Sequence, residues 1–377
     1  MANNNENKIL NVPHLRFPEF SGEWKKCTLG EIGKGFDYGM NAAAKPFDGQ
    51  HKYIRITDID ESSAAYIDKD VVSPDGELQD SYLVKANDIL LARTGASTGK
   101  SYLYDNKDGI LYFAGFLIRV NIPSDNAYFV FSQLHLSRYR KWIGIMSARS
   151  GQPGVNSQEY SNYPIYLPKI EEQTKIAKLL KLVDERIATQ NKIIEKLQSL
   201  IKGLIVALTT KGKPNIAISQ CLECHSSTLQ ESEVLPNGLY KVFGANGLIG
   251  YTNMAQMNGD AILIIKDGSG VGTVSYAQGR FSVIGTLNYL TSKGNHDLRY
   301  LYFALSAFNF QLYKTGMAIP HIYFKDYGNA KIYCPVLAEQ KRVANVLGKL
   351  ESKLFAEKKL RASFNLQKQY LLEQMFI

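Results

Sequence analysis

The sequence of 377 residues is poor in cysteine and contains no long apolar run. Four cysteines are too few for a disulfide framework, which fits a reducing compartment. The longest apolar stretches, such as 261–265 and 204–208, fall far short of the roughly 18 residues that a membrane span needs. The first residues also lack the basic and apolar regions of a signal peptide. We therefore expect a cytoplasmic protein that contacts no membrane.

Composition places the chain among folded, multidomain proteins. The apolar fraction of 45% is too high for an intrinsically disordered chain. At roughly 150 residues per domain, the length predicts two or three domains. Lysine and arginine total 44 against 35 aspartate and glutamate, so the net charge is +9. This excess indicates a polyanionic partner.

The chain contains an internal repeat. Residues 160–177 reappear as residues 327–344 without a gap, at an offset of 335 − 168 = 167 measured between Pro168 and Pro335. Both copies carry a Glu-Gln pair shortly after the proline. A repeat of this kind predicts two related structural units.

A heptad pattern follows each copy and predicts two long helices. The first helix would run from about Glu172 to Thr209, roughly 57 Å at 1.5 Å per residue. The predicted apolar seam comprises Ile176, Leu180, Val183, Ile187, Ile194, Leu197, Ile201 and Leu204 in the first helix and Val343, Leu347, Leu350 and Leu354 in the second. Such a stripe needs a partner along its length, so we predict an antiparallel coiled coil of the two helices. The alternative is two amphipathic helices that pack on separate globular cores. Beyond Glu357 the seam weakens, because Arg361 and Lys368 occupy seam positions.

Each helix is preceded by a region rich in strand signals. In the first region we expect strands at 53–59, 88–94 and 116–121 and helix at 128–143; in the second, strands at 240–243, 261–266 and 287–290 and helix at 298–313. Glycine turns at 95–99 and 268–272 resemble a phosphate loop only loosely, and we predict strand-to-strand turns with positive φ.

The expected fold class is α+β, with two globular mixed α/β modules separated by two long helices in a pseudo-twofold internal repeat. The predicted parts are a lead-in at 1–17, a first module at 18–168, a first helix at 169–210, a second module at 211–335 and a second helix at 336–377.

No catalytic residues are expected. The Cys221, Cys224 and His225 cluster has the spacing of haem attachment but no export signal, and zinc would need a fourth ligand. We therefore predict no metal site. No convincing pair of nucleophile and base was found.

The remaining candidates are residues that could bind DNA, because Lys and Arg neutralise phosphates and polar side chains in loops read base edges. They are Arg55, Arg93, Lys100, Arg149, Gln152, Asn156, Lys241, Lys266, His321, Tyr323 and Lys325. The loops 150–156 and 318–323 look best placed, since the 167-residue offset aligns them. Four tyrosines lie among the basic residues of the first module and join this inventory: Tyr53, Tyr102, Tyr112 and Tyr139.

The repeated blocks 167–177 and 334–344, the opening stretch 13–32 and residues 240–251 resemble the specificity subunits of type I restriction-modification systems. The resemblance implies that each module is a target recognition domain reading one half of a split, asymmetric site in double-stranded DNA. It implies that the helices set the spacer and dock two modification (methyltransferase) subunits, with motor and restriction subunits joining the full complex. It also implies no cofactor on this chain, because S-adenosylmethionine, ATP and Mg would belong to the partners.

Two other classes stay open at this point. One is a non-enzymatic coiled-coil adaptor whose two modules bind protein or carbohydrate. The other is a lone methyltransferase, which is disfavoured because the sequence shows neither a cofactor loop nor a catalytic loop.

Overall fold

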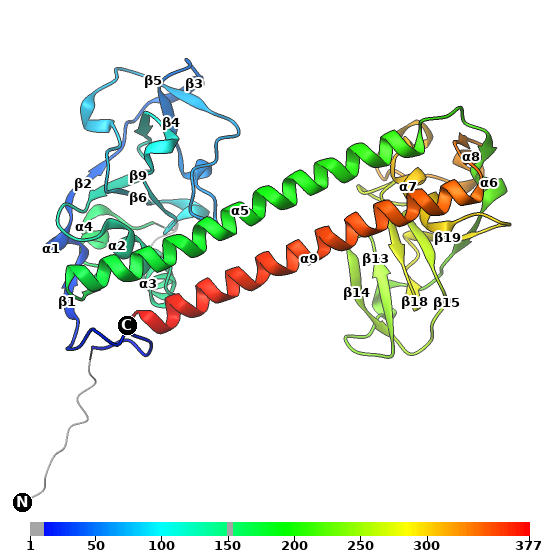
Figure 1. Ribbon diagram of the computed structural model, residues 1–377. Coiled ribbons are helices and arrows are strands. Elements are labelled where there is room, and N and C mark those ends of the chain that lie inside the picture. Colours follow the sequence, from blue (N-terminus) through cyan, green and yellow to red (C-terminus); the bar gives the residue numbers. More distant parts are fainter. Residues whose placement is uncertain (1–10, 149–153) are drawn as a thin grey trace, which may run out of the picture. The chain divides into compact units, whose positions relative to one another are not determined.

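The computed structural model describes residues 11–148 and 154–377 (Figure 1). They form two compact units. The first unit comprises the residues up to Thr189 together with Ala362–Ile377, and the second unit comprises Gln190–Arg361. The long helices α5 (Ile170–Thr209) and α9 (Leu337–Met375) each contribute one segment to each unit. Both units combine helices and strands, which confirms the predicted mixed fold.

The first unit is built on an antiparallel four-stranded sheet with the order β2-β9-β6-β7. These strands are β2 (Lys34–Tyr38), β9 (Leu117–Asn121), β6 (Asp88–Ala92) and β7 (Ser101–Leu103). Every residue of β6 is buried, including Asp88 at its start. The other elements are β1 (Lys25–Thr28), α1 (Leu29–Ile32), β3 (Ala43–Pro46), β4 (Lys52–Ile54), β5 (Val72–Asp75), β8 (Leu111–Phe113), α2 (Ala127–Gln133), α3 (Ser137–Ser147), α4 (Ser157–Ser161) and β10 (Pro164–Leu167).

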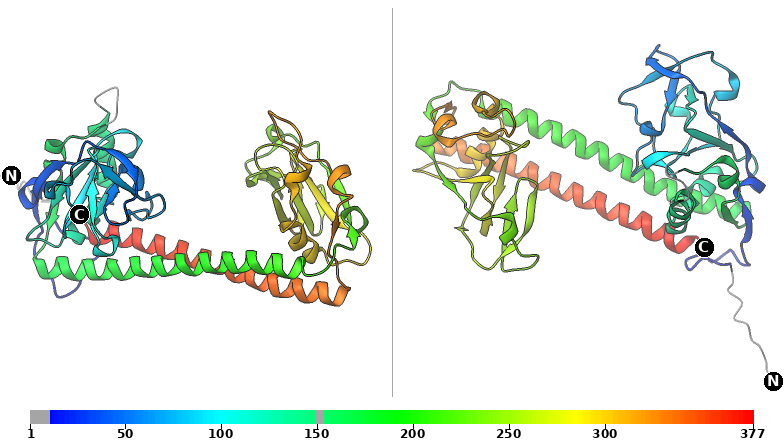
Figure 2. Two further views of the ribbon diagram at one scale, coloured as in Figure 1. Left: turned by 90° about the horizontal axis from the view of Figure 1, so that it is seen from above. Right: turned by 180° about the vertical axis from the view of Figure 1, so that it is seen from behind.

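The second unit repeats this sheet with the order β12-β19-β16-β17, again fully antiparallel. Its strands are β12 (Leu222–Ser226), β19 (Leu287–Ser292), β16 (Ala261–Ile265) and β17 (Val274–Ala277). Figure 2 shows the sheet of each unit from two further directions. The other elements are β11 (Ile216–Ala217), α6 (Ile218–Cys221), β13 (Tyr240–Gly244), β14 (Gly247–Thr252), β15 (Met257–Asn258), β18 (Arg280–Val283), α7 (Leu298–Ser306), α8 (Phe324–Tyr327) and β20 (Lys331–Ile332).

The two units differ in the strands outside this common sheet. Each has one short antiparallel pair, β1 with β10 in the first and β11 with β20 in the second. The first has two further pairs, β3 with β5 and β4 with β8. The second has a further four-stranded sheet with the order β14-β13-β18-β15. The repeat in sequence therefore preserves the four-stranded sheet, the strand pair just before the long helix and the helix start, while the remaining strands diverge.

A buried glutamine in each repeated block joins the long helix to its unit. Gln173 Oε1 accepts a hydrogen bond from Asn126 N at 3.0 Å, and its Nε2 donates to Pro168 O at 3.1 Å. Gln340 makes the same bonds, at 2.9 Å from Asp297 N and 2.7 Å to Pro335 O. Asn126 and Asp297 are the N-caps of α2 and α7. The repeated Glu-Gln pair thus has a structural reason in both units.

Within each unit the two long helices pack antiparallel. In the first, Leu180 is fully buried in a cluster with Leu372 and Met375, and Asp184 forms an ion pair with Lys368 at 2.6 Å. Lys368, which weakened the predicted seam, therefore has a partner on α5.

In the second unit, the helix pairing continues with a polar contact. Gln190 bonds to the side chain of Glu357 and to its carbonyl at 3.2 Å. Leu204 and Leu208 of α5 pack against the cluster that contains Val343 and Leu347 of α9. All predicted seam residues of both helices are buried or half-buried.

Three sequence-based element predictions need correction. The strand expected at 53–59 ends at Ile54, because Asp58 accepts bonds from Arg55 and closes a 3-10 turn over Ile56–Asp58. The helix expected at 128–143 is two helices, α2 and α3. That at 298–313 ends at Ser306, and a 3-10 turn, Phe310–Tyr313, follows it.

The glycine turns are confirmed as strand-to-strand turns with positive φ. Gly95 and Gly99 have φ of 68° and 89°, and Gly268 and Gly272 have 96° and 85°. In the part of the chain that the structure describes, no helix is long and apolar enough to cross a membrane.

Candidate nucleic-acid interface

Three strand ends meet at one end of the common sheet in the first unit. Tyr38 ends β2, Arg93 follows β6, and Phe116 precedes β9. The antiparallel register brings these ends together, because Tyr38 pairs with Ile118 and Ala92 with Leu117. We call Tyr38, Arg93 and Phe116 the first-unit cluster.

The guanidinium of Arg93 is held in place by a hydrogen bond and two rings. Its Nε donates to Gly115 O at 3.0 Å, and its Cζ lies 5.0 Å from the ring centre of Tyr38 and 6.0 Å from that of Phe116. Tyr38 and Phe116 are 43% and 55% exposed, although both are large apolar rings. An arginine held on exposed aromatic faces is typical of a recognition surface.

The loop before α4 is fastened to this cluster. Val155 N donates to Arg93 O at 2.9 Å, and Thr94 and Gly154 form an isolated bridge. Ser157 N donates to Tyr38 Oη at 3.3 Å. A hydrogen bond with the Ser157 side chain lowers the pKa of Tyr38 from its ordinary value. The cluster therefore rests on fixed backbone from four segments.

The second unit builds the same junction around Lys266. Lys266 N donates to Thr286 O at 3.0 Å, as Arg93 N does to Phe116 O, and Ile322 N donates to Lys266 O at 2.9 Å. Val155 and Ile322, the two loop donors, lie 167 residues apart. The repeat therefore extends to individual backbone hydrogen bonds.

The side chains at this junction differ between the units. Tyr38 pairs with Ile118 and Ser226 pairs with Asn288 in equivalent registers, so Ser226 takes the place of Tyr38. In the same way Thr286 takes the place of Phe116. An arginine between two rings in the first unit is thus replaced by a lysine beside two hydroxyl residues in the second.

Three predicted residues gather next to Lys266 in the second unit. His321 packs edge-on against Tyr323 at 5.0 Å, and Lys325 Nζ lies 5.2 Å from the Tyr323 ring centre. Thr315 and His321 close a loop through two backbone bonds of 2.8 and 2.9 Å. Within that loop Met317 is fully exposed.

The other predicted DNA-binding residues are spread over both units. Arg55 forms two bonds of 2.8 Å with Asp58, and Lys100 lies 4.0 Å from Glu61. Asn156 caps α4 through a bond from Glu159 N, and Lys241 is exposed on β13. Arg149 and Gln152 lie outside the described residues.

The four tyrosines that were grouped with the candidate DNA-binding residues belong to the core instead. Exposure is 2% for Tyr53, 1% for Tyr102, 7% for Tyr112 and 2% for Tyr139. Tyr53 Oη donates to Met40 O at 2.7 Å, which satisfies its hydroxyl inside the unit. Tyr38 and Phe116, which the sequence analysis missed, carry the exposed aromatic surface. Phe116 starts the strand predicted at 116–121, whereas no strand was predicted near Tyr38.

The cysteine cluster is divided between α6 and β12. Burial raises the pKa of Cys221 to about 12 and that of Cys224 to about 11, which disfavours the thiolates that bind metals. His225 Nε2 lies 3.0 Å from Thr291 Oγ1, and its ring stacks on Tyr289. Over residues 11–148 and 154–377, no three His, Cys, Asp or Glu side chains converge as a metal site would require.

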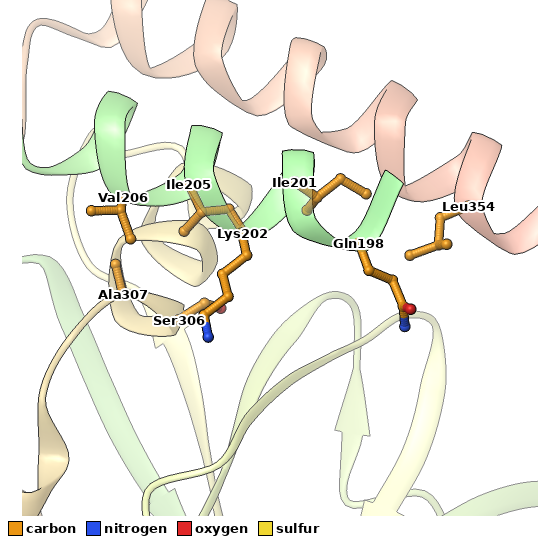
Figure 3. Close-up of a pocket in the computed structure, with 8 residues that line it drawn as sticks. All are labelled: Gln198, Ile201, Lys202, Ile205, Val206, Ser306, Ala307 and Leu354. Atoms are coloured by element: carbon orange, nitrogen blue, oxygen red, sulfur yellow. The ribbon is translucent and has the colours of Figure 1, made fainter. Parts of the chain in front are cut away.

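Two hollows lie away from these clusters. One of about 380 Å³ in the first unit is lined by charged residues, among them Lys34, Lys85, Arg119, Asp37 and Asp88. The other, in the second unit, is a groove of about 330 Å³ (Figure 3). It is lined by Gln198, Ile201, Lys202, Ile205, Val206, Ser306, Ala307 and Leu354.

Comparison with known proteins gives consistent matches. The model of the type I restriction modification DNA specificity domain matches residues 21–199 and 222–363. Two curated relatives come from Methanocaldococcus jannaschii. The type I restriction enzyme MjaVIII specificity subunit is 29% identical over 214 residues, 55% of this chain and 46% of the relative. The putative MjaX specificity subunit is 32% identical over 137 residues, 35% of this chain and 32% of the relative. The aligned part thus spans less than half of each relative.

Solved structures share the fold. The type I restriction-modification S subunit from M. genitalium covers 97% of this chain and 99% of its own, with a TM-score of 0.68 and 18% identity. A chain from a study of complex assembly and conformational transition of the type I R-M system covers 94% of this chain and 97% of its own, with a TM-score of 0.55 and 16% identity. At these identities the likeness establishes the architecture alone.

Proposed function

The chain belongs to the family of type I restriction modification DNA specificity domains, and from this premise we propose that it is the DNA-reading specificity subunit of a type I restriction-modification system. One observation carries the proposal: the family model matches twice, once over each copy of the repeat. The equivalent junctions at Arg93 and Lys266 support it, because both offer basic side chains on fixed loops.

Each unit reads one half of a bipartite, asymmetric site. The common sheet and the loop donors Val155 and Ile322 repeat, whereas the side chains at the junction and the remaining strands differ. Equivalent backbones with unlike side chains suit two half-sites of unlike sequence.

The long helices serve as the spacer and as the docking site for two methyltransferase subunits, through which restriction subunits join. Large apolar side chains on both helices support a docking role, since Leu182 is 52% exposed, Phe355 60% and Leu366 68%. This chain reads DNA in the cytoplasm and leaves catalysis, with S-adenosylmethionine, ATP and Mg, to the partners.

Selection of bound duplexes from a random pool tests this function. The full chain, purified with methyltransferase subunits, should enrich two short unlike motifs at a fixed separation. Affinity should fall steeply between about 50 and 200 mM salt, because phosphate contacts release counterions. Absence of DNA binding at low salt would contradict the proposal and favour an adaptor that binds protein or carbohydrate.

A further inference from the structure

The first-unit cluster supports a more specific inference about how one half-site is recognised, and this inference rests on the proposed function. We infer that Arg93 recognises a guanine in the half-site of the first unit, by donating from its two Nη atoms to guanine O6 and N7 in the major groove.

The orientation of the Arg93 side chain is the first ground for the guanine assignment. Because Nε is engaged by Gly115 O, the end of the guanidinium that carries both Nη atoms is left for a ligand. Among residues 11–148 and 154–377, neither Nη atom of Arg93 has a hydrogen-bond partner. Two parallel N–H donors match the paired acceptors that guanine presents in the major groove.

Charge distinguishes Arg93 from three other arginines of the first unit. Arg16, Arg55 and Arg119 form ion pairs at 2.7 to 2.8 Å with Glu172, Asp58 and Asp37. Within the described residues, Arg93 has no carboxylate within 4.0 Å, so its charge remains available for a ligand.

The rigidity of the Arg93 side chain is the third ground for the guanine assignment. The rings of Tyr38 and Phe116 flank the guanidinium, and backbone bonds to Phe116 and Val155 fix the residue itself. A side chain that is already ordered loses less entropy on binding, which suits base recognition more than a loose phosphate contact. Among the residues that the structure describes, no aromatic ring flanks the Lys266 ammonium, so the inference applies to the first unit only.

The test uses the full chain with methyltransferase subunits and the duplex obtained by selection. The first half-site is the one that changes when residues 18–168 are exchanged for another module. Each of its guanines is replaced in turn by 7-deazaguanine, which lacks the N7 acceptor. We expect about a 10-fold loss of affinity at one position, the effect of one charged hydrogen bond.

Variants then assign that loss to Arg93. Arg93→Ala should abolish the sensitivity to 7-deazaguanine and weaken binding to the unmodified site by about 10- to 100-fold, with relaxed preference at that position. Arg93→Lys keeps the charge and the stem as a check on folding, and should reduce the preference without abolishing it, because an ammonium lacks the planar fork of two parallel donors. Lys107→Ala removes a positive charge at an exposed position of the same unit; it is the matched control and should leave the guanine preference unchanged.

The outcomes separate the two proposals. An equal loss on every sequence would show a phosphate contact and overturn the guanine assignment. Retention of the guanine preference in Arg93→Ala would overturn it as well, while the proposed function would stand. No sequence preference in the unaltered complex would overturn both.

Discussion

At the scale of single residues, buried polar side chains explain the repeated sequence block. Gln173 and Gln340 are 1% and 2% exposed, and each satisfies one donor and one acceptor of the neighbouring backbone. A buried glutamine without such partners would be costly. Both glutamines are therefore fixed by the groups around them.

Replacing Gln173 by leucine should lower the free energy of unfolding by about 2 to 3 kcal/mol, because Asn126 N and Pro168 O would be buried without partners. Urea denaturation measures the loss. Gln340→Leu should produce a similar loss, and Lys178→Gln, at an exposed position of the same helix, should produce none. A Gln173→Leu protein as stable as the original would contradict this account.

His135 gives the first unit a pH dependence. Burial, together with the charge of Lys368, lowers its pKa from 6.5 to about 4, and the ring nitrogen Nδ1 lies 3.0 Å from Phe131 O. The folded state therefore holds this histidine neutral, whereas the unfolded chain takes up a proton near pH 6.5.

Because the folded pKa lies below the unfolded one, the stabilising contribution is complete above about pH 6.5 and is lost as the pH falls toward 4. The loss is at most about 3 kcal/mol. Denaturation at pH 7.5 and at pH 5 should show this loss as a lower free energy of unfolding at pH 5. His135→Gln should reduce the difference in that free energy between the two pH values. An unchanged difference in the variant would assign the effect to other groups.

At the scale of elements, the heptad pattern predicted the two helices well because it is a local property of the sequence. The predicted helix from about Glu172 to Thr209 compares with Ile170–Thr209 in the structure. The strand predicted at 53–59 was wrong beyond Ile54, because capping by the Asp58 side chain outweighed β propensity.

The seam of α5 can be tested with two neighbouring leucines. Leu180→Asp should destabilise the first unit by about 3 to 5 kcal/mol, since Leu180 is fully buried against Leu372 and Met375. Leu182→Asp should change stability by less than about 0.5 kcal/mol, because Leu182 is 52% exposed. Calorimetry distinguishes them, and equal effects would contradict the assigned seam.

At the scale of the whole molecule, the proposed spacer role of the helices has a measurable consequence. One heptad inserted into each long helix keeps the seam in register and adds about 10 Å. The separation between the two selected motifs should then grow by about 3 base pairs, at 3.4 Å each. Selection from a random pool measures it, and an unchanged separation would exclude the helices as the determinant of spacing.

The sequence by itself determined the repeat, the two helices, their seam and the glycine turns, because each depends on the periodicity or spacing of neighbouring residues. It also carried the family resemblance through the blocks around Pro168 and Pro335. The candidate residues came from composition and spacing, which cannot distinguish a buried tyrosine from an exposed one. Tyr53 was therefore placed on the surface when it lies in the core.

Only the tertiary structure decided where Arg93 lies and what surrounds it. Tyr38 and Phe116 stand 55 and 23 residues from Arg93 in the sequence, and the register of three antiparallel strands brings them together. The same register shows that Ser226 and Thr286 hold the equivalent places. Contacts between strand ends depend on pairing across the sheet, so no local pattern in the sequence could reveal them.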